Sequence, residues 1–191
     1  MPDVAADRRV RRTRAAIQRA LLALMAEKGY EAVTATDIIE RADIGRSTFY
    51  THFTDKQHVL YDSLDDLGDF LRDQRRPGHD GVLGFGLALF EHVDEQRDLV
   101  RVLLGRRGGR VVQDRVAHLL AELVREDLAA LDGPAPDVPL DLVVTGVVGT
   151  YLALLRTWAD SGTTWTPAEM DDVARRLLGP GLAALFGPVT A

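Results

Sequence analysis

The sequence predicts an all-α protein with an N-terminal three-helix helix-turn-helix domain and a C-terminal helical bundle. Three observations predict this class. Apolar residues recur at intervals of three and four along most of the 191 residues, which is the period of an α-helix. Capping sequences and glycine- or proline-rich breaks separate these segments. Two of the segments are short and are joined by a tight turn, as in a helix-turn-helix.

The N-terminal elements follow from local signals. The first helix has an apolar face made of Ile17, Leu21, Leu24 and Met25. Gly29 ends it, because glycine accepts the left-handed backbone of a helix C-terminus. Thr34 opens a capping box with Asp37 in the usual place of Glu, so a short helix is expected over 35–42. Residues 43–45 make a turn, and a second short helix follows over 46–53.

A long helix over 55–75 comes next. Thr54 and Asp55 cap it, and its apolar stripe is Leu60, Leu64, Leu67 and Leu71. It ends before Pro77 and Gly78, which form the clearest boundary in the chain. Apolar helical patterns then cover residues 82–93, 99–104, 111–131, 140–159 and 170–186. The β-branched run 143–148 is interpreted as helix because its neighbours are helical and it has no strand to pair with.

Two features near the C-terminus refine the last helix. Thr166 to Glu169 is a full capping box, with Pro167 at the first helical position. Pro180, between Gly179 and Gly181, is expected to kink or end the helix, because proline has no N–H to donate.

Composition narrows the function classes. The chain contains no Cys, which excludes disulfides, thiol nucleophiles and Cys-ligated metals. Residues 1–60 carry a net charge of +2 and residues 61–191 a net charge of −8, so a basic head precedes an acidic body. Such asymmetry suggests that one end meets a polyanion.

The longest uncharged apolar stretch, 142–155, is shorter than the ~20 residues that span a bilayer. We expect a cytoplasmic protein with no membrane contact.

The short-helix pair carries the most specific motif. The major groove of DNA admits one α-helix, and a second helix across its back fixes the angle of entry. Residues 34–60 contain the core Thr48-Phe49-Tyr50-x-His52-Phe53-x-x-Lys56. This segment resembles the DNA-binding domain of the tetracycline-repressor (TetR) family from about Thr13 to Leu64. The resemblance implies a double-stranded DNA operator as partner.

The resemblance also implies residue roles. Thr34 would cap the second helix and touch a phosphate, as Thr36 could, and Lys56 would clamp a phosphate. The expected DNA-binding residues are Thr34, Thr36, Gly45, Arg46, Ser47, Thr48, Tyr50, His52 and Lys56. Three departures from the family pattern concern sequence preference: Asp43 in place of a turn glycine, Gly45 in place of a capping Ser, and Ile39 in place of a small residue.

In this family the C-terminal part makes a homodimer and binds a small effector. Residues 158–170 and 177–182 also resemble such regulators. We expect a mostly apolar pocket for a neutral or weakly charged hydrophobic or aromatic molecule, inside the C-terminal bundle. The candidate ligand-binding residues are Phe85, Leu89, His92, Leu103, His118, Leu119, Tyr151, Leu155 and Trp158. The predicted dimer pairs the helix over 140–159 and the last helix with their symmetry mates.

The expected organisation is a basic N-terminal arm over 1–12, a DNA-binding domain over 13–58 linked through the helix 55–75, and an effector-binding and dimerisation domain over 59–191. We expect a ligand-released regulator, most simply a repressor acting on a palindromic operator. Two alternatives stay open: an effector-independent architectural DNA-binding protein, and a helical small-molecule enzyme. No Gly-x-Ser-x-Gly or His-Glu-x-x-His motif supports catalysis, and we expect no catalytic residue, metal or cofactor.

Overall fold

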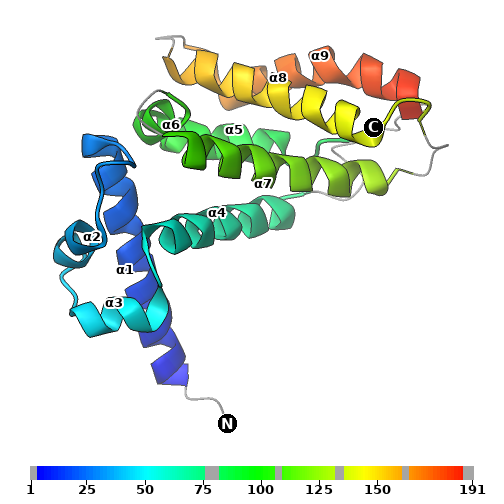
Figure 1. Ribbon diagram of the computed structural model, residues 1–191. Helices are drawn as coiled ribbons and strands as arrows, with labels where there is room; N and C mark the ends of the chain where they lie inside the picture. Colours follow the sequence, from blue (N-terminus) through cyan, green and yellow to red (C-terminus); the bar gives the residue numbers. More distant parts are fainter. Residues whose placement is uncertain (1–3, 76–81, 106–108, 132–135, 161–163, 187–191) are drawn as a thin grey trace.

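The computed structural model describes residues 4–75, 82–105, 109–131, 136–160 and 164–186, and this part of the chain forms nine α-helices and no β-strand (Figure 1). The helices are α1 (Val4–Lys28), α2 (Ala35–Arg41), α3 (Arg46–His52), α4 (Lys56–Asp73), α5 (Gly86–Glu95), α6 (Arg97–Leu104), α7 (Gly109–Ala129), α8 (Leu140–Asp160) and α9 (Pro167–Phe186). The predicted all-α class is therefore confirmed.

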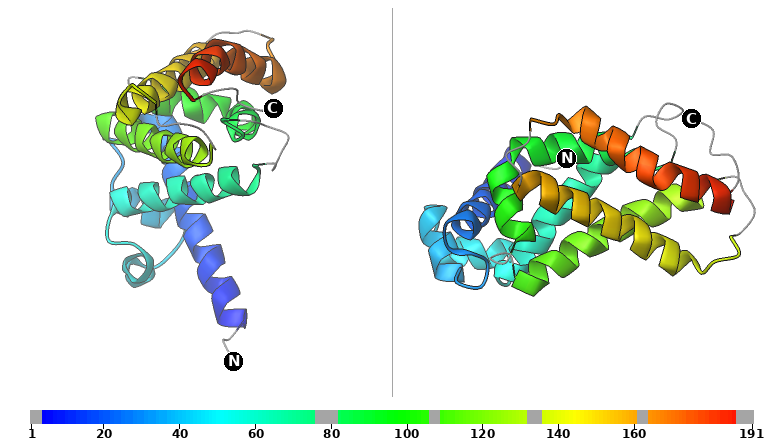
Figure 2. Two further views of the ribbon diagram at one scale, coloured as in Figure 1. Left: turned by 90° about the vertical axis from the view of Figure 1, so that its right-hand side faces the viewer. Right: turned by 90° about the horizontal axis from the view of Figure 1, so that it is seen from above.

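The helices form a head and a body joined by α4. In the head, α2 and α3 pack beside the long helix α1 (Figure 1). In the body, α4 lies under α7, and α8 and α9 form the layer farthest from α3 (Figures 1 and 2). The helix α4 belongs to both parts, because its first turns contact α1 and its later turns contact α7.

Two predicted boundaries need correction. The basic arm over 1–12 is not a separate element, since residues 4–12 are the first turns of α1. The helix predicted from residue 82 begins at Gly86, because Leu83 has a φ of 70°, which no α-helix contains. The predicted end of the last helix at residue 186 is confirmed, and the helix continues through Pro180 to Phe186 instead of ending at the proline. The Pro77-Gly78 boundary and the breaks at 133–135 and 161–163 lie outside the described residues.

One continuous apolar core runs through head and body. Its largest fully buried side chains include Phe49 and Phe53 in the head and Tyr151 and Trp158 in the body. The interpretation of 143–148 as helix is confirmed, since these residues lie within α8. Length and composition alone would allow α8 to cross a membrane, but 44% of its most apolar window is buried among neighbouring helices.

Candidate DNA-binding surface and effector cavity

The helix α2 is fixed to α1 by a cap and two ion pairs. The Thr34 hydroxyl accepts from the Asp37 N–H at 3.2 Å, and the Asp37 carboxylate accepts from the Thr34 N–H at 2.7 Å. Lys28 of α1 lies 2.8 Å from the same carboxylate. The Lys28 ammonium, followed by the two Thr34 donors, holds the pKa of Asp37 well below its usual range. Arg41 and Glu27 form the second pair at 2.7 Å.

The turn between α2 and α3 shows the expected consequences of its unusual residues. Asp43 adopts a left-handed backbone with a φ of 52°, a conformation that Asp tolerates better than most residues. Gly45 is the N-cap of α3 and supplies no side-chain cap. The start of α3 therefore depends on tertiary packing rather than on local capping.

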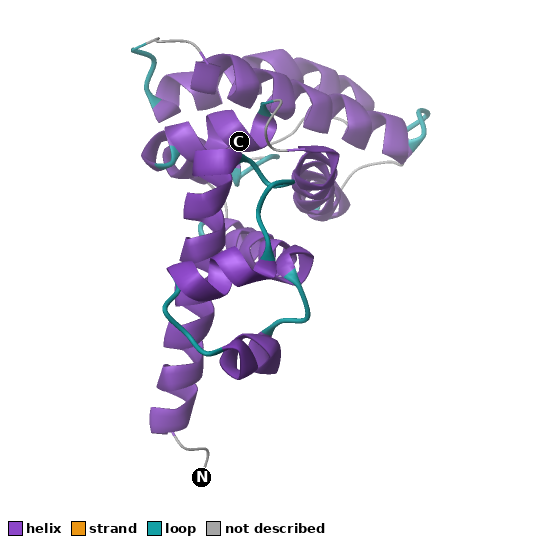
Figure 3. Cartoon of the chain, turned by 60° about the vertical axis from the view of Figure 1, so that its left-hand side comes forward, coloured by secondary structure: helices purple, strands orange, loops and turns teal. Residues whose placement is uncertain are grey.

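The helix α3 lies at the outside of the head (Figure 3), and it has one buried and one exposed side. Phe49 is fully buried, and its ring centroid lies 6.2 Å from that of Phe53, which follows the helix. On the other side Tyr50 is 51% exposed and contacts Phe49 edge to face. Of the nine expected DNA-binding residues, those that are exposed are Thr34, Thr36, Gly45, Arg46, Ser47 and Tyr50. The expected DNA-binding residues thus lie on or next to α2, α3 and the start of α4. The remaining three, Thr48, His52 and Lys56, are half-buried.

Lys56 is placed differently from the expectation. Its ammonium donates to the main-chain carbonyls of Tyr30 at 2.9 Å, Glu31 at 3.2 Å and Val33 at 2.9 Å. Because an ammonium has three N–H donors, all three are directed at the α1–α2 loop. A phosphate contact would require Lys56 to leave these carbonyls, so the geometry favours a positioning role.

A cavity of about 500 Å³ lies between α1, α4, α5, α6 and α7, with one residue from α8. Five of the nine candidate ligand residues line it: Leu89, His92, Leu103, Leu119 and Leu155. Most of the wall is aliphatic. Burial lowers the pKa of His92 against the opposing effect of Glu95, which favours a neutral imidazole at the wall.

The other four candidates lie elsewhere. Phe85, Tyr151 and Trp158 form an aromatic stack with Phe90 in the core, with ring centroids 5.4–6.0 Å apart. Trp158 also donates through Nε1 to the carbonyl of Trp165 at 3.1 Å. His118 is on the exposed side of α7, 3.3 Å from Glu122.

The cavity also has a wall that sequence reasoning missed. Residues of α1 and α4 enclose it from the head side, among them Gln18, Arg19, Leu22, Ser63, Asp66 and Phe70. The sequence predicts a pocket inside the C-terminal bundle. The structure places it at the junction of head and body instead. No local sequence signal places α1 against α6, although the α4 stripe of Leu60, Leu64 and Leu67 does reach the cavity.

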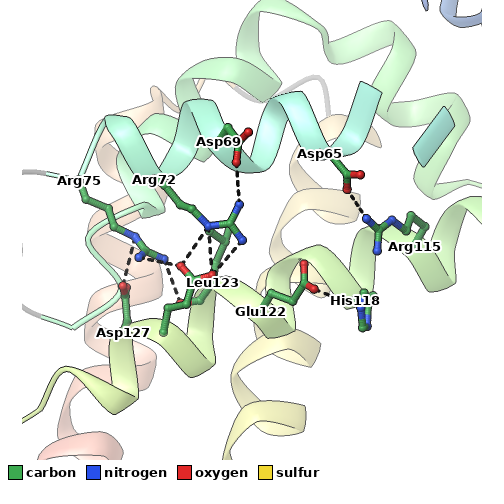
Figure 4. A network of polar contacts seen from close by, with 10 residues as sticks. Asp65, Asp69, Arg72, Arg75, Arg115, His118, Glu122, Leu123 and Asp127 are labelled. Carbon is green, nitrogen blue, oxygen red and sulfur yellow. Dashed lines mark hydrogen bonds and ion pairs between the residues drawn. The ribbon is translucent and has the colours of Figure 1, made fainter. Parts of the chain in front are cut away.

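The body end of α4 is held by arginine pairs (Figure 4). Arg72 pairs with Glu126 of α7 at 2.8 Å, and Arg75 pairs with Glu126 at 3.0 Å and with Asp127 at 3.2 Å. Nearer the head, Asp65 of α4 pairs with Arg115 of α7. These contacts tie α4 to α7 along one side, while the cavity borders another side of the same helix.

The outer face of α8 and α9 carries unusually exposed apolar residues. Leu142 is 63% exposed and Leu177 is 61% exposed. A Cβ built on Gly146 or Gly149 would meet no atom within 4 Å in the described part of the chain. These positions are therefore open in the single chain.

Comparisons with known proteins agree with this architecture. Residues 17–61 match the family model "Bacterial regulatory proteins, tetR family", and residues 83–179 match the model "Transcriptional regulator C-terminal region". The chain is 47% identical over 55 residues to the HTH-type transcriptional regulator YxbF of Bacillus subtilis (strain 168), a match covering 28% of this chain and 14% of YxbF. It is 25% identical over 114 residues to YvkB of the same organism, covering 58% and 59% of the two chains. The match to these curated relatives therefore spans well under two thirds of their length.

Solved structures share the whole fold. A TetR transcriptional regulator from Streptococcus agalactiae 2603V superimposes with a TM-score of 0.67 at 23% identity, covering 91% of this chain and 97% of that one. Thermus thermophilus FadR gives a TM-score of 0.58 at 24% identity, covering 88% and 94%. With family models matched over most of the chain and the fold shared with these structures, the chain belongs to the TetR family of transcriptional regulators.

Proposed function

We propose that the protein is a homodimeric, cytoplasmic repressor that binds a palindromic DNA operator through α2 and α3 and is released by a small hydrophobic effector. The observation that carries the proposal is the cavity of about 500 Å³ between the head helices α1 and α4 and the body helices. A ligand in this place touches both parts of the molecule. It can therefore favour one head orientation over another, which is the condition for releasing DNA.

Known relatives support a ligand and a repressor role. FadR of Thermus thermophilus is a TetR family repressor that was solved in complex with lauroyl-CoA, so this fold accepts a small molecule with a long apolar chain. NalD of Pseudomonas aeruginosa is the secondary repressor of a multidrug efflux pump. The same fold also serves the activator DhaS, so the sign of regulation depends on where the operator lies.

The outer face of α8 and α9 supports the dimer. Exposed leucines at positions 142 and 177, and glycines open enough for a close helix approach, are what a four-helix interface requires. A two-fold dimer would present two copies of α3 on the same side, matching the symmetry of a palindrome.

The proposal is tested with the purified full-length chain and its own promoter region, inspected for an inverted repeat. Fluorescence anisotropy should show tight binding to that duplex and weak binding to a scrambled one. Tyr50→Ala should weaken specific binding about 5- to 150-fold, as expected for loss of ~1–3 kcal/mol of contact free energy. Trp165→Ala, which removes an aromatic side chain of similar exposure far from the head, is the matched control. Equal affinity of the wild type and Tyr50→Ala for the duplex would show that Tyr50 of α3 does not contact DNA.

A further inference from the structure

At the head-side wall of the cavity, one amide of α1 contacts two carboxylates of α4. Gln18 of α1 donates from Nε2 to Asp66 at 2.7 Å and to Asp62 at 3.0 Å, both on α4. Gln18 and Asp66 line the cavity, whereas Asp62 lies behind them. Since an amide NH2 has two donors, both are used by these acids.

Asp66 differs from its neighbours on α4. Asp62, Asp65 and Asp69 each pair with an arginine, namely Arg14, Arg115 and Arg72. Within the described ranges Asp66 has no ion-pair partner and accepts only from the neutral Gln18 amide. The acid that borders the cavity is thus the one of these four whose charge is not balanced by an arginine.

We propose that Asp66 anchors the effector, and that the effector is an apolar molecule with a hydrogen-bond-donating head group, best a protonated amine. The proposal rests on the proposed function, because it takes the cavity to be the effector site. Charge-assisted N–H···O bonds are shorter and roughly twice as strong as neutral ones, so an ammonium competes successfully with the Gln18 amide for Asp66. The rest of the wall is mostly aliphatic and suits an alkyl or ring body. Among the lining residues, Asp66 and Glu95 outweigh the single cation Arg19.

A chain of contacts leads from Gln18 to α3. Asp62 holds Gln18 on one carboxylate oxygen and Arg14 on the other. The Arg14 guanidinium stands 4.8 Å from the centre of the Phe53 ring, and Phe53 packs on Phe49 of α3. An effector that binds Asp66 and displaces the Gln18 amide therefore loosens the contact between α1 and α4. This contact supports the buried side of α3. Contiguity alone is no proof of coupling, so the experiment measures both parts.

The ligand class is tested with three probes of equal chain length: 1-aminodecane, 1-decanol and decanoic acid. Each is titrated into the full-length protein bound to a labelled duplex selected from random DNA. The amine should release DNA at a concentration at least 10-fold lower than the acid. Asp66→Asn should remove this preference for the amine. Asp73→Asn, the same charge change at an exposed position of α4 outside the cavity, should keep it.

The route to α3 is tested without any ligand. Gln18→Glu places a third carboxylate against Asp62 and Asp66 and should lower DNA affinity at least 10-fold. Ala23→Glu adds the same charge at an exposed position of α1 and should change affinity less than 2-fold. Gln18→Lys bridges both acids, so it should keep DNA affinity at the wild-type level or above and raise the amine concentration needed for release. This second variant decides the matter if Gln18→Glu does not fold, and adding Asp66→Asn to Gln18→Glu should restore part of the affinity.

The outcomes distinguish a failure of the proposed function from a failure of the Asp66 assignment. A wild type that selects no duplex overturns the proposed function. A wild type that binds DNA but responds equally to all three probes, or to none, overturns the assignment of Asp66 and leaves the DNA-binding function standing. Wild-type affinity in Gln18→Glu overturns the route through Asp62 and Arg14. So does a Gln18→Lys variant that loses DNA affinity or releases DNA at the wild-type amine concentration.

Discussion

The ammonium of Lys56 donates to the main-chain carbonyl of Tyr30 at 2.9 Å and also stands 4.5 Å from the centre of the Tyr30 ring. One side chain at the start of α4 thereby holds the end of the loop that follows α1. Burial, with smaller contributions from Glu31 and Asp55, raises the pKa of Tyr30 to about 12. The contact therefore ties the start of α4 to the α1–α2 loop.

We expect Lys56→Met to lower the free energy of unfolding by about 2 kcal/mol, the size of net hydrogen bonds to a charged group. The methionine keeps the alkyl stem but leaves the loop carbonyls without their donor. Lys28→Met is the matched control, because Lys28 forms an exposed ion pair that solvent screens, so its loss should change stability less. Urea unfolding measures both. If Lys56→Met unfolds like the wild type but lowers the salt dependence of DNA binding by about one phosphate contact, the earlier phosphate role is correct.

A second prediction concerns the closest approach of α4 to α7. A Cβ on Gly68 would lie 2.7 Å from Leu119 Cδ1 and 3.1 Å from Arg72 Nη1. We expect Gly68→Ala to destabilise the protein by roughly 1 kcal/mol, since overpacking of 1–3 kcal/mol outweighs the helix propensity gained. The double variant with Leu119→Ala should cost less than the sum of the two single variants. Strict additivity in urea unfolding would show that the two residues do not compete for space.

A third prediction addresses the dimer. Gly149 faces open space in the single chain, so Gly149→Arg should fold normally yet introduce a charge into the proposed interface. We expect sedimentation velocity at micromolar concentration to show a dimer for the wild type and a monomer for the variant. Ala129→Arg, at the exposed end of α7, should stay dimeric. A dimeric Gly149→Arg would move the interface away from this face.

A fourth prediction concerns pH. Burial lowers the pKa of His92 below its ordinary value of 6.5, so the unfolded chain takes up this proton at a higher pH than the folded protein does. The unfolded state then binds more protons, and stability falls as the pH drops below about 6.5. We expect the free energy of unfolding to fall more between about pH 7.5 and pH 5.5 in the wild type than in His92→Gln. Parallel curves would mean that the imidazole is not shielded in the folded state.

Local signals predicted most helices and their caps. The boxes at Thr34 and Thr166 need only four residues of sequence, and both form as expected. Asp43 stands where the family pattern has a turn glycine, and its left-handed backbone agrees with that place. The late start of α5 could not be predicted, because the left-handed Leu83 is a bulky residue in a conformation that sequence rules assign to glycine.

The features that the sequence did not predict depend on contacts between residues far apart in the chain. The acceptors of Lys56 are main-chain carbonyls, which leave no signature in the residue types. The head-side wall of the cavity requires knowing that α1 lies against α6. His118 is the exception, because the buried stripe of α7 at positions 112, 119, 120 and 123 already places residue 118 on the other side. Helical periodicity alone could have removed it from the ligand set.

The most direct test of the account is selection of binding sites from random duplex DNA with the purified full-length chain, followed by sequencing of the bound pool. A dimer that reads DNA through two copies of α3 should enrich an inverted repeat whose half-site centres lie about 10 base pairs, or a multiple of this, apart. The monomeric Gly149→Arg variant should lose that enrichment. A pool without sequence preference, or one enriched in a single site lacking two-fold symmetry, would contradict the central claim.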